Sequence, residues 1–258
     1  MVLQQTAGLN YRPTRIVSLV PSQTELLYHL GLDAETIGIT KFCIHPQSWF
    51  KTKDRIGGTK TVNIDKIHQI KPDLIIANKE ENVKEQIEAL AVDYPVWVTD
   101  INNLADALQM IAEIGTLTGK SSAAIALIDN ISKAFNEIPK IKYPVKTAYL
   151  IWRKPYMTVG GDTFINDMLQ QCGFQNIFAD KARYPEISIA ELQTANCQLL
   201  LLSSEPYPFK QKHIDELSSQ LPGTKIILAD GEFFSWYGSR LLQSPCYFMQ
   251  LIAQIQSL

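Results

Sequence analysis

An amphipathic run near the middle of the chain, from Ser121 to Ile138, constrains the possible folds more than any other sequence feature. Its apolar residues recur at intervals of three and four, the spacing that places them on one face of an α-helix of about five turns. Gly119 precedes the run and Pro139 follows it, so the helix is bounded at both ends. We expect this helix to connect two halves of the chain; the alternative is an ordinary helix inside one continuous domain.

The composition is that of a globular protein with one large or two smaller domains. The chain has 258 residues, of which 46% are hydrophobic and 19% are charged. Its formal net charge is −2, and its lysines and arginines are scattered, which argues against a nucleic-acid partner. No stretch reaches the roughly 20 apolar residues of a membrane span, and residues 1–15 lack the basic start and apolar run of a secretory signal. These features predict a soluble, cytoplasmic chain without a membrane span.

Strand-like and helix-like segments alternate through the first half of the chain. A capping box from Ser22 to Glu25 should open the first helix, which ends at Gly31. The alternation implies a mainly parallel sheet covered by helices. The expected strands are 15–20, 36–40, 55–58, 73–77 and 96–98, and further helices are expected at 64–70, up to Leu90, and at 103–117.

The second half repeats the pattern. Residues 64–80 can be laid over residues 189–205, and residues 25–32 over residues 167–174, which favours an internal duplication. The predicted fold is α/β, with two Rossmann-like lobes of mainly parallel sheet joined by a single long α-helix. We place the N-terminal lobe at 1–118, the connecting helix at 119–138 and the C-terminal lobe at 139–258. The expected strands are 146–152, 199–202 and 225–229, the expected helices are 164–172, about 213–221 and from about 239, and a second capping box is expected at 188–191.

In an open α/β sheet, ligands bind beyond the carboxyl ends of the strands. If the two lobes face each other, the loops at these ends line a cleft between them. Aromatic rings there would supply rigid apolar surface, and lysines and arginines would donate to acidic or amide groups, which suits a large, partly planar ligand with a polar edge. For each ring, the alternative is packing beneath the loops. The expected ligand-contact residues are Ser22, Phe42, His45, Lys60, Lys79, Glu80, Glu81, Trp152, Arg153, Tyr156, Glu205, Tyr207, Phe234, Trp236, Tyr237 and Arg240.

Two carboxylates and a cysteine–histidine pair are the candidates for catalysis. Glu80 and Glu81 can act as an acid–base pair, although ion pairing across the cleft explains them equally well. Cys43 and His45 form a C-x-H pair, but such neighbours point in alternate directions and the usual third catalytic group is not evident. We expect no catalytic residues and no enzyme activity; an enzyme that uses Glu80, Glu81 or His45 is a remote alternative.

Metal and nucleotide motifs are absent from the sequence. The four histidines show neither H-x-x-H nor H-E-x-x-H spacing, and the four cysteines lie far apart without a C-x-x-C pair. The segment from Gly115 to Ser121 resembles the end of a P-loop, but it is one residue too short and follows a helix rather than a strand. We expect no metal site and no cofactor of the protein's own.

Several segments resemble the class III periplasmic substrate-binding proteins, the helical-backbone receptors of cobalamin, ferric siderophores and haem. The resemblance covers nearly the whole chain and is closest to the cobalamin-binding branch. The segments that carry it are RIVSLVPSQTELLYHLGL (15–32), IGIT (37–40), VNIDKIHQIKPDLIIAN (62–78), LTGKSSAA (117–124), PYMTVGGDTFINDML (155–169) and YPEISIAEL (184–192).

The resemblance implies a monomeric, non-enzymatic receptor that holds a cobalamin-like corrinoid or an iron chelate between rigid lobes and delivers it to an ABC importer. The bound ligand would be cobalamin, haem or a ferric siderophore, and the family implies a periplasmic location. Docking to the permease uses one acidic residue on each lobe. Asp65 matches the first position; Ala190 matches the second, with Glu191 beside it as the candidate. The alternative is a cytosolic ligand carrier or sensor with the same cleft and no permease.

Overall fold

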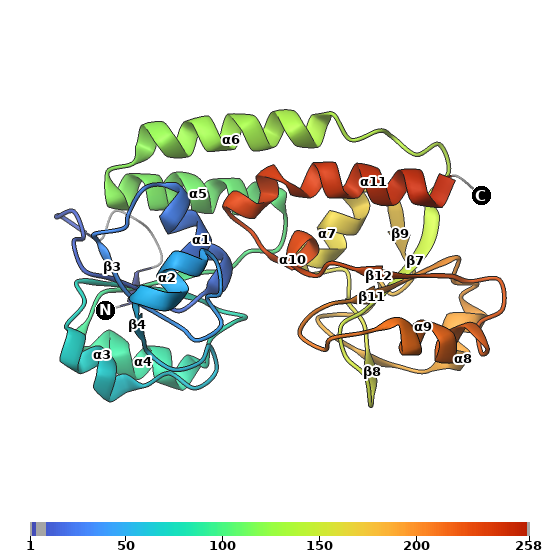
Figure 1. Ribbon diagram of the computed structural model, residues 1–258, viewed down its shortest axis with the longest axis horizontal. Helices are drawn as coiled ribbons and strands as arrows, with labels where there is room; N and C mark the ends of the chain where they lie inside the picture. The colour runs from blue at the N-terminus through green and yellow to red at the C-terminus, as the bar shows by residue number, and fades with distance from the viewer. Residues whose placement is uncertain (1, 4–8, 257–258) are drawn as a thin grey trace. The chain divides into compact units, whose positions relative to one another are not determined.

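The computed structural model describes residues 2–3 and 9–256, which form two compact units (Figure 1). Neither unit is a single stretch of sequence. Unit 1 takes in the described residues up to Ile101, together with Ala105–Ile131 and Tyr237–Arg240. Unit 2 takes in Asn102–Leu104, Ser132–Trp236 and the described residues from Leu241 onward. The lobe boundaries expected at 118/119 and 138/139 stay a prediction.

Unit 1 is built on a parallel six-stranded sheet with the strand order β1-β6-β5-β2-β3-β4. The two central strands, β2 and β5, are buried along their whole length. Strands of a parallel sheet are apolar throughout when helices cover both faces. The strands are β1 (Val2–Leu3), β2 (Ile16–Ser18), β3 (Thr36–Ile39), β4 (Asp54–Arg55), β5 (Leu74–Asn78) and β6 (Val96–Thr99).

Helices cover both faces of this sheet. Figure 1 shows α3 and α4 on one face and α1 and α5 on the other. Ile67 of α3 and Leu90 of α4 are fully buried in a cluster with Ile75 of the sheet. The helices are α1 (Pro21–His29), α2 (Gln47–Thr52), α3 (Ile64–Ile70), α4 (Lys84–Asp93) and α5 (Leu104–Thr118).

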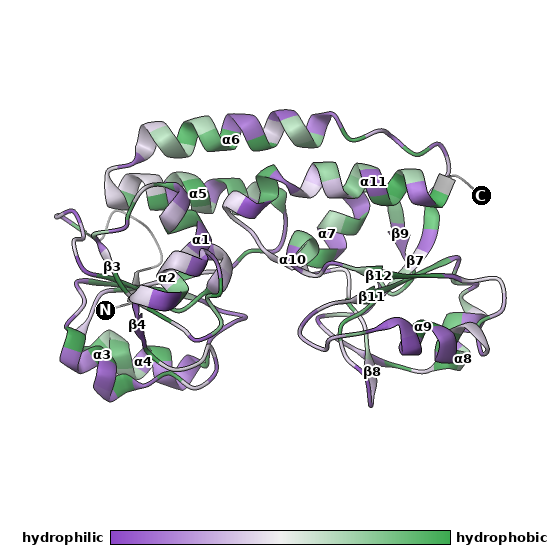
Figure 2. Cartoon of the chain, in the orientation of Figure 1, coloured by the Kyte–Doolittle hydropathy of each residue, from purple (hydrophilic) through white to green (hydrophobic). Residues whose placement is uncertain are grey.

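Unit 2 contains a parallel four-stranded sheet with the order β12-β11-β7-β9 and a separate antiparallel pair, β10-β8. Figure 2 shows β11 and β12 in the colour of hydrophobic residues. The strands are β7 (Val145–Leu150), β8 (Tyr156–Met157), β9 (Phe174–Asn176), β10 (Glu186–Ile187), β11 (Leu199–Ser203) and β12 (Lys225–Ala229).

The four-stranded sheet is also covered on both faces. Leu192 of α8 and Leu217 of α9 pack in one cluster with Leu200 and Leu202 of β11, while α7 and α11 lie on the opposite face (Figure 1). The helices are α7 (Phe164–Gln171), α8 (Ile189–Thr194), α9 (Gln211–Ser218), α10 (Glu232–Ser235), the 3₁₀ turn η2 (Ser239–Leu242) and α11 (Ser244–Gln256).

The long helix predicted from the amphipathic run is α6 (Ser121–Asn136), which carries the chain from unit 1 into unit 2. Its stripe is buried as expected, at Ala124, Leu127, Ile131 and Phe135. The helix ends two residues before Ile138, which is buried beyond the helix end. Among the residues described, none of the helices combines the length and the apolar character required to cross a lipid bilayer.

The internal repeat has a structural counterpart. The overlay pairs α3 with α8 and places β5 (Leu74–Asn78) on β11 (Leu199–Ser203) residue for residue. The shorter overlay pairs α1 with α7, and each helix is followed by a glycine with positive φ, 71° at Gly31 and 74° at Gly173. A left-handed residue at this position ends a helix, and glycine adopts it without strain.

The first capping box does not form. Helix α1 begins at Pro21, whose fixed φ suits the first helical position, so Ser22 lies inside the first turn and Val20 is the N-cap residue without a side-chain cap. Glu25 instead forms an ion pair with Arg240. The second capping box, between Ser188 and Glu191, is present as predicted.

Several short elements differ from the sequence expectation. The third strand is only Asp54–Arg55, and the final helix starts at Ser244 after the 3₁₀ turn that begins at Ser239. Sequence periodicity missed β1, α2, β8, β9, β10 and α10. These elements contain two to six residues, too few to display a helical or strand period.

Candidate ligand-binding site

Asn82 ties together three loops at the carboxyl ends of the unit 1 strands. Its Nδ2 donates to the carbonyl oxygens of Leu19 after β2 and Thr59 after β4, at 3.4 and 3.0 Å. Its Oδ1 accepts from the backbone N–H of Asn78 at 2.8 Å. Because Asn82 is buried, water does not compete strongly for these bonds. The side chain therefore fixes the loops that were expected to contact a ligand.

Asn78 shapes the turn that carries Glu80 and Glu81. Its Oδ1 accepts from the backbone N–H groups of Glu80 and Glu81, at 2.8 and 3.1 Å. Its Nδ2 donates to the backbone oxygen and the Oγ1 of Thr99, each at 3.1 Å. The two carboxylates thus project from a turn that is anchored to the neighbouring strand, and both side chains are partly exposed.

The two lysines predicted in unit 1 both have partners on the protein. Lys79 forms an ion pair with Asp100, with 2.5 Å between Nζ and Oδ2, and Lys60 donates to the backbone oxygen of Glu80 at 2.6 Å. Both lysines are exposed. An exposed ion pair contributes about 0.5 kcal/mol, so an acidic ligand group can take the place of Asp100.

The loop after β3 alternates between outward and inward side chains. Phe42 and Ile44 are exposed, whereas the intervening Cys43 is fully buried and accepts a hydrogen bond from the Thr24 hydroxyl at 3.1 Å. Burial raises the pKa of the Cys43 thiol. A buried, protonated thiol is a poor nucleophile, so the structure excludes the paired role considered for Cys43 and His45.

A cavity of about 750 Å³ opens in unit 1 beside α4, β6 and α5. Of the described residues predicted to contact ligand, only Lys79 lines it, so it is largely separate from the predicted site. Its walls carry charges of both signs. The lining residues are Asn78, Lys79, Asn82, Lys84, Ile87, Glu88, Trp97, Val98, Thr99, Asp100, Ile101, Asp106, Gln109, Met110 and Glu113.

In unit 2, Trp152 and Tyr207 form an aromatic pair beyond two neighbouring strands. Trp152 follows β7 and Tyr207 follows β11, which pairs with β7 in parallel. The rings meet edge to face, with 5.8 Å between their centroids. Trp152 is 40% exposed, a large fraction for a tryptophan. The structure thus brings together two predicted residues as a partly exposed aromatic surface.

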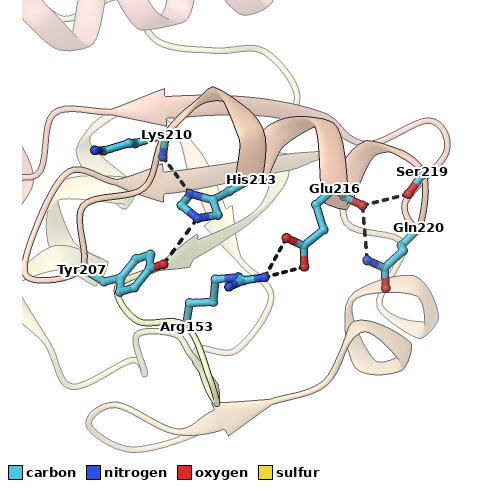
Figure 3. Close-up of polar contacts among 7 residues, drawn as sticks. All are labelled: Arg153, Tyr207, Lys210, His213, Glu216, Ser219 and Gln220. Atoms are coloured by element: carbon cyan, nitrogen blue, oxygen red, sulfur yellow. Dashed lines mark hydrogen bonds and ion pairs between the residues drawn. The ribbon is translucent and has the colours of Figure 1, made fainter.

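Arg153 binds a carboxylate within unit 2. Its Nη2 donates to both carboxylate oxygens of Glu216 on α9, each at 2.7 Å (Figure 3). Hydrogen bonding between the two groups raises the pKa of Arg153 and lowers the pKa of Glu216. The guanidinium therefore anchors the loop after β7, and its contact with a ligand stays a prediction.

Phe234 and Arg240, which were expected to contact a ligand, are buried instead. The ring of Phe234 is fully buried between Tyr149 and Phe248, with centroid distances of 5.2 and 4.8 Å, so it is part of the unit 2 core. Arg240 belongs to unit 1, where its Nε and Nη2 donate to the two carboxylate oxygens of Glu25 at 3.1 and 2.7 Å. Neither side chain presents a surface to a ligand.

Glu205 holds the carboxyl end of α10. One of its oxygens accepts from Ser235 Oγ at 2.7 Å and from Trp236 Nε1 at 3.0 Å. Burial, the largest cause, raises the pKa of Glu205, and the negative charge of Glu232 adds to the effect. Trp236 itself is buried, so Glu205 and Trp236 support the loop from within.

The other side chains predicted to contact a ligand differ in their solvent exposure. Ser22 and Tyr237 are buried, and Tyr156 lies on β8, partly buried against the core cluster of unit 2. His45, which precedes a proline and lies three residues after Phe42, is partly exposed. Of the predicted contact residues, Phe42, Lys60, Lys79 and Trp152 are exposed. Those that are partly exposed are His45, Glu80, Glu81, Arg153, Tyr156, Glu205 and Tyr207.

The two predicted docking positions are each the second residue of a helix, on α3 and α8, which the internal repeat pairs with each other. Asp65 is exposed in the first turn of α3, and Ala190 is exposed in the first turn of α8. Glu191 is engaged within unit 2: it completes the capping box of α8 and pairs with Lys181 at 2.8 Å. Hydrogen bonds from Lys181 and Ser188 lower the pKa of Glu191 to about 2.

A metal site is not evident in residues 2–3 and 9–256, where no group of three or more His, Cys, Asp or Glu side chains is placed to hold an ion. Carboxylates at the strand ends instead have hydrogen-bonding partners, as at Glu205.

Comparison with known proteins decides the family. Residues 16–225 match a family model described as periplasmic binding protein. The chain belongs to the periplasmic binding protein family. The family match and the relatives below confirm the resemblance drawn from the sequence, and these relatives are binding proteins rather than enzymes.

The relatives cover nearly the whole chain. The vitamin B12-binding protein of Yersinia pestis (strain Pestoides F) is 25% identical over 249 residues, which are 93% of this chain and 87% of that protein. The periplasmic vitamin B12-binding protein of Vibrio cholerae has a TM-score of 0.78 at 20% identity and covers 95% of this chain and 99% of its own. The periplasmic haem-binding protein of the same organism has a TM-score of 0.80 at 19% identity, covering 93% and 98%. These structures confirm the α/β fold with parallel sheets in two lobes.

Sequence reasoning missed the residues that organise the strand-end loops of this periplasmic binding protein. Asn78 is the last residue of the buried strand β5 and Asn82 lies four residues beyond it, and asparagine at such positions commonly bonds the backbone of a turn. That signal was present in the sequence. Nothing local marked Glu216, because its partner Arg153 lies 63 residues earlier in the chain.

The Asn82→Ala variant is expected to lose about 2 kcal/mol of unfolding free energy. The substitution leaves the buried N–H of Asn78 and the carbonyl oxygen of Thr59 without their bonds to Asn82, and unmade buried hydrogen bonds carry a penalty of this size. Urea denaturation followed by circular dichroism measures the loss. Asn63→Ala is the matched control, because Asn63 caps α3 at an exposed position and should cost about 1 kcal/mol. Equal losses would contradict the role given to Asn82.

Proposed function

We propose that the chain binds a cobalamin-like corrinoid or an iron chelate through the loops at the carboxyl ends of its strands and delivers the ligand to an ABC importer. The observation that carries the proposal is the partly exposed Trp152–Tyr207 pair beyond two adjacent parallel strands. The names of the relatives support the ligand class, since they bind vitamin B12 or haem.

The side chains at the strand ends suit such a ligand. In unit 2, the rings of Trp152 and Tyr207 offer flat apolar surface to a macrocycle, and aromatic side chains bind large ligands with little loss of conformational entropy. Lys60 and Lys79 are exposed cations whose present partners are exchangeable. They would donate to the carboxylates of haem, to the amides of a corrinoid or to acidic groups of a siderophore.

Calorimetric titration with cobalamin, haem and a ferric siderophore tests the proposal. We expect one of the three to bind at micromolar affinity or better, and native mass spectrometry of protein from its own organism should reveal the same ligand by its mass. Failure of all three to bind more tightly than about millimolar would contradict the proposed ligand class.

The Trp152→Ala variant is expected to bind that ligand at least tenfold more weakly, because a single aromatic anchor commonly contributes more than about 1.4 kcal/mol. The same titration measures the change. Tyr143→Ala is the control: Tyr143 is 72% exposed just before the amino end of β7, the end opposite to Trp152. Equal affinities for the wild type and the Trp152 variant would place the ligand elsewhere.

A carrier or sensor that works without a permease is the second candidate, and the docking positions favour it. Asp65 is exposed and acidic, but Ala190 occupies the equivalent place on α8 and Glu191 is engaged with Lys181. Fractionation of the native organism distinguishes the two functions. A pool confined to the cytosol would contradict delivery to an importer.

A further inference from the structure

Helix α9 presents two polar side chains to the loops that carry the aromatic pair. His213 and Glu216 are three residues apart and therefore share one face of the helix. Figure 3 shows the Tyr207 hydroxyl directed at His213 and the Arg153 guanidinium directed at Glu216. His213 is only 3% exposed, so its bonds form away from bulk water.

Glu216 anchors the loop after β7. Both of its carboxylate oxygens accept from Arg153, and Arg153 directly follows Trp152 in the chain. The indole of Trp152 is thus carried by the residue next to one that Glu216 holds in place. Since charge-assisted hydrogen bonds are stronger than neutral ones, this contact restricts where the Trp152 ring can lie.

His213 anchors the loop after β11 at two points. Its Nδ1 lies 2.9 Å from the backbone nitrogen of Lys210, and its Nε2 lies 3.3 Å from the Tyr207 hydroxyl. A backbone N–H can only donate, so Nδ1 is an acceptor and carries no proton. In the neutral ring the proton is then on Nε2, which donates to the Tyr207 oxygen. This arrangement requires a neutral imidazole.

The charges around His213 favour that neutral form. Arg153 from the loop after β7, Lys210 from the loop after β11 and Lys212 on α9 are cationic, and Glu216 is the opposing anion. The neighbouring strand β12 contains one ionisable residue, Lys225, whose ammonium group donates to the carbonyl oxygen of Gln254 on α11. Burial, the largest cause, and the cations lower the pKa of His213 below its ordinary value.

We propose that His213 and Glu216 are positioning residues for the Trp152–Tyr207 pair, and that protonation of His213 in acid releases Tyr207 and weakens ligand binding. A second proton on the ring would face the Lys210 N–H, so that contact must break and the loop must move. The ligand-binding part of this inference rests on the proposed function. The protonation step is a property of the ligand-free protein.

The ligand-free protein is tested first, by an NMR pH titration of the wild type. We expect the amide resonance of Lys210 to shift with the same midpoint as the His213 ring, and that midpoint to lie below about 6.5, the ordinary histidine value. The Lys210 amide should not titrate in this range in His213→Gln, whose side chain carries no ionisable proton. An amide of Lys210 that ignores the His213 titration would overturn the inference, whichever ligands the protein binds.

Ligand binding is then measured from pH 7.5 to pH 5, with whichever of cobalamin, haem and the ferric siderophore binds the wild type. The affinity should fall by up to tenfold for each pH unit below the His213 midpoint, whereas the affinity of His213→Gln should stay level. His68→Gln is the matched control, because His68 also contacts a tyrosine hydroxyl, that of Tyr94 at 3.0 Å, but is exposed on α3. His68→Gln should keep the wild-type profile.

Glu216→Gln separates positioning from protonation. It should weaken binding by several-fold at neutral pH, because the amide has only one oxygen for Arg153. The affinity should still fall in acid, with a lower midpoint, because the Glu216 charge that raises the pKa of His213 is gone. Identical pH profiles for the wild type and His213→Gln would overturn the proposal. If none of cobalamin, haem and the ferric siderophore binds any variant, the proposed function fails while the NMR titration still decides the protonation step.

Discussion

The Gly57→Ala variant is expected to lose about 4 kcal/mol of unfolding free energy, the loss coming from two separate causes. Gly57 has a φ of 97°, which a residue with a side chain adopts only under strain. A Cβ atom there would also lie 2.4 Å from the carbonyl oxygen of Thr61 and 2.8 Å from the backbone nitrogen of Asn63. Both contacts are with backbone, so the loop that carries Lys60 must shift. Urea denaturation followed by circular dichroism measures the loss.

Gly31→Ala separates the two causes. Gly31 also has a positive φ, 71°, but the nearest atom to an added Cβ is the Lys120 ammonium nitrogen at 3.9 Å. Only the backbone strain remains, so the expected loss is about 1 kcal/mol. If the two variants lost the same free energy, crowding at Gly57 would have no part in the effect.

Removing Glu25 is expected to destabilise the protein by about 3 to 5 kcal/mol, because it takes the carboxylate from a nearly buried arginine. The Arg240 side chain is 10% exposed and that of Glu25 is 18% exposed, so little water reaches either group. The Glu25→Ala variant tests this by its urea midpoint. In this variant, the backbone amides of α1 should also exchange hydrogen faster than in the wild type, and by a larger factor than amides far from α1.

Two further variants define the origin of that loss. Glu25→Met combined with Arg240→Met should recover most of the lost stability, since apolar side chains can replace a buried ion pair without a large penalty. Lys84→Ala breaks an exposed pair with Glu88 and should change stability by less than about 0.5 kcal/mol. A double variant as unstable as Glu25→Ala would contradict the explanation from an unpaired charge.

Elements set by local periodicity were predictable from the sequence. Helix α3 was placed at its observed bounds, and the stripe of α6 from Ala124 to Phe135 is buried as expected. The parallel sheets followed from the alternation of strands and helices. In each case the signal lies within one element, because a helix or strand long enough to bury one face repeats its apolar residues at a fixed interval.

The candidate site was less predictable because its side chains are held by distant partners. Arg240 was assigned to a ligand, yet it pairs with Glu25, 215 residues earlier in the chain. Arg153 was assigned in the same way, yet it pairs with Glu216. Trp152 and Tyr207 were placed correctly at strand ends, because the carboxyl ends of parallel strands lie at the same edge of a sheet. Their status as ligand contacts stays a prediction.

The discontinuity of unit 1 has a consequence for how the protein is made. The ion pair and the close contact of Gly238 with α1 are supplied by Tyr237–Arg240, although most of unit 1 lies before residue 132. On the ribosome, α1 emerges early and its partner segment only after some two hundred further residues have been translated. Unit 1 therefore reaches its final form after most of unit 2 has already been synthesised, and a nascent chain stalled beyond α6 would still lack the segment that completes it.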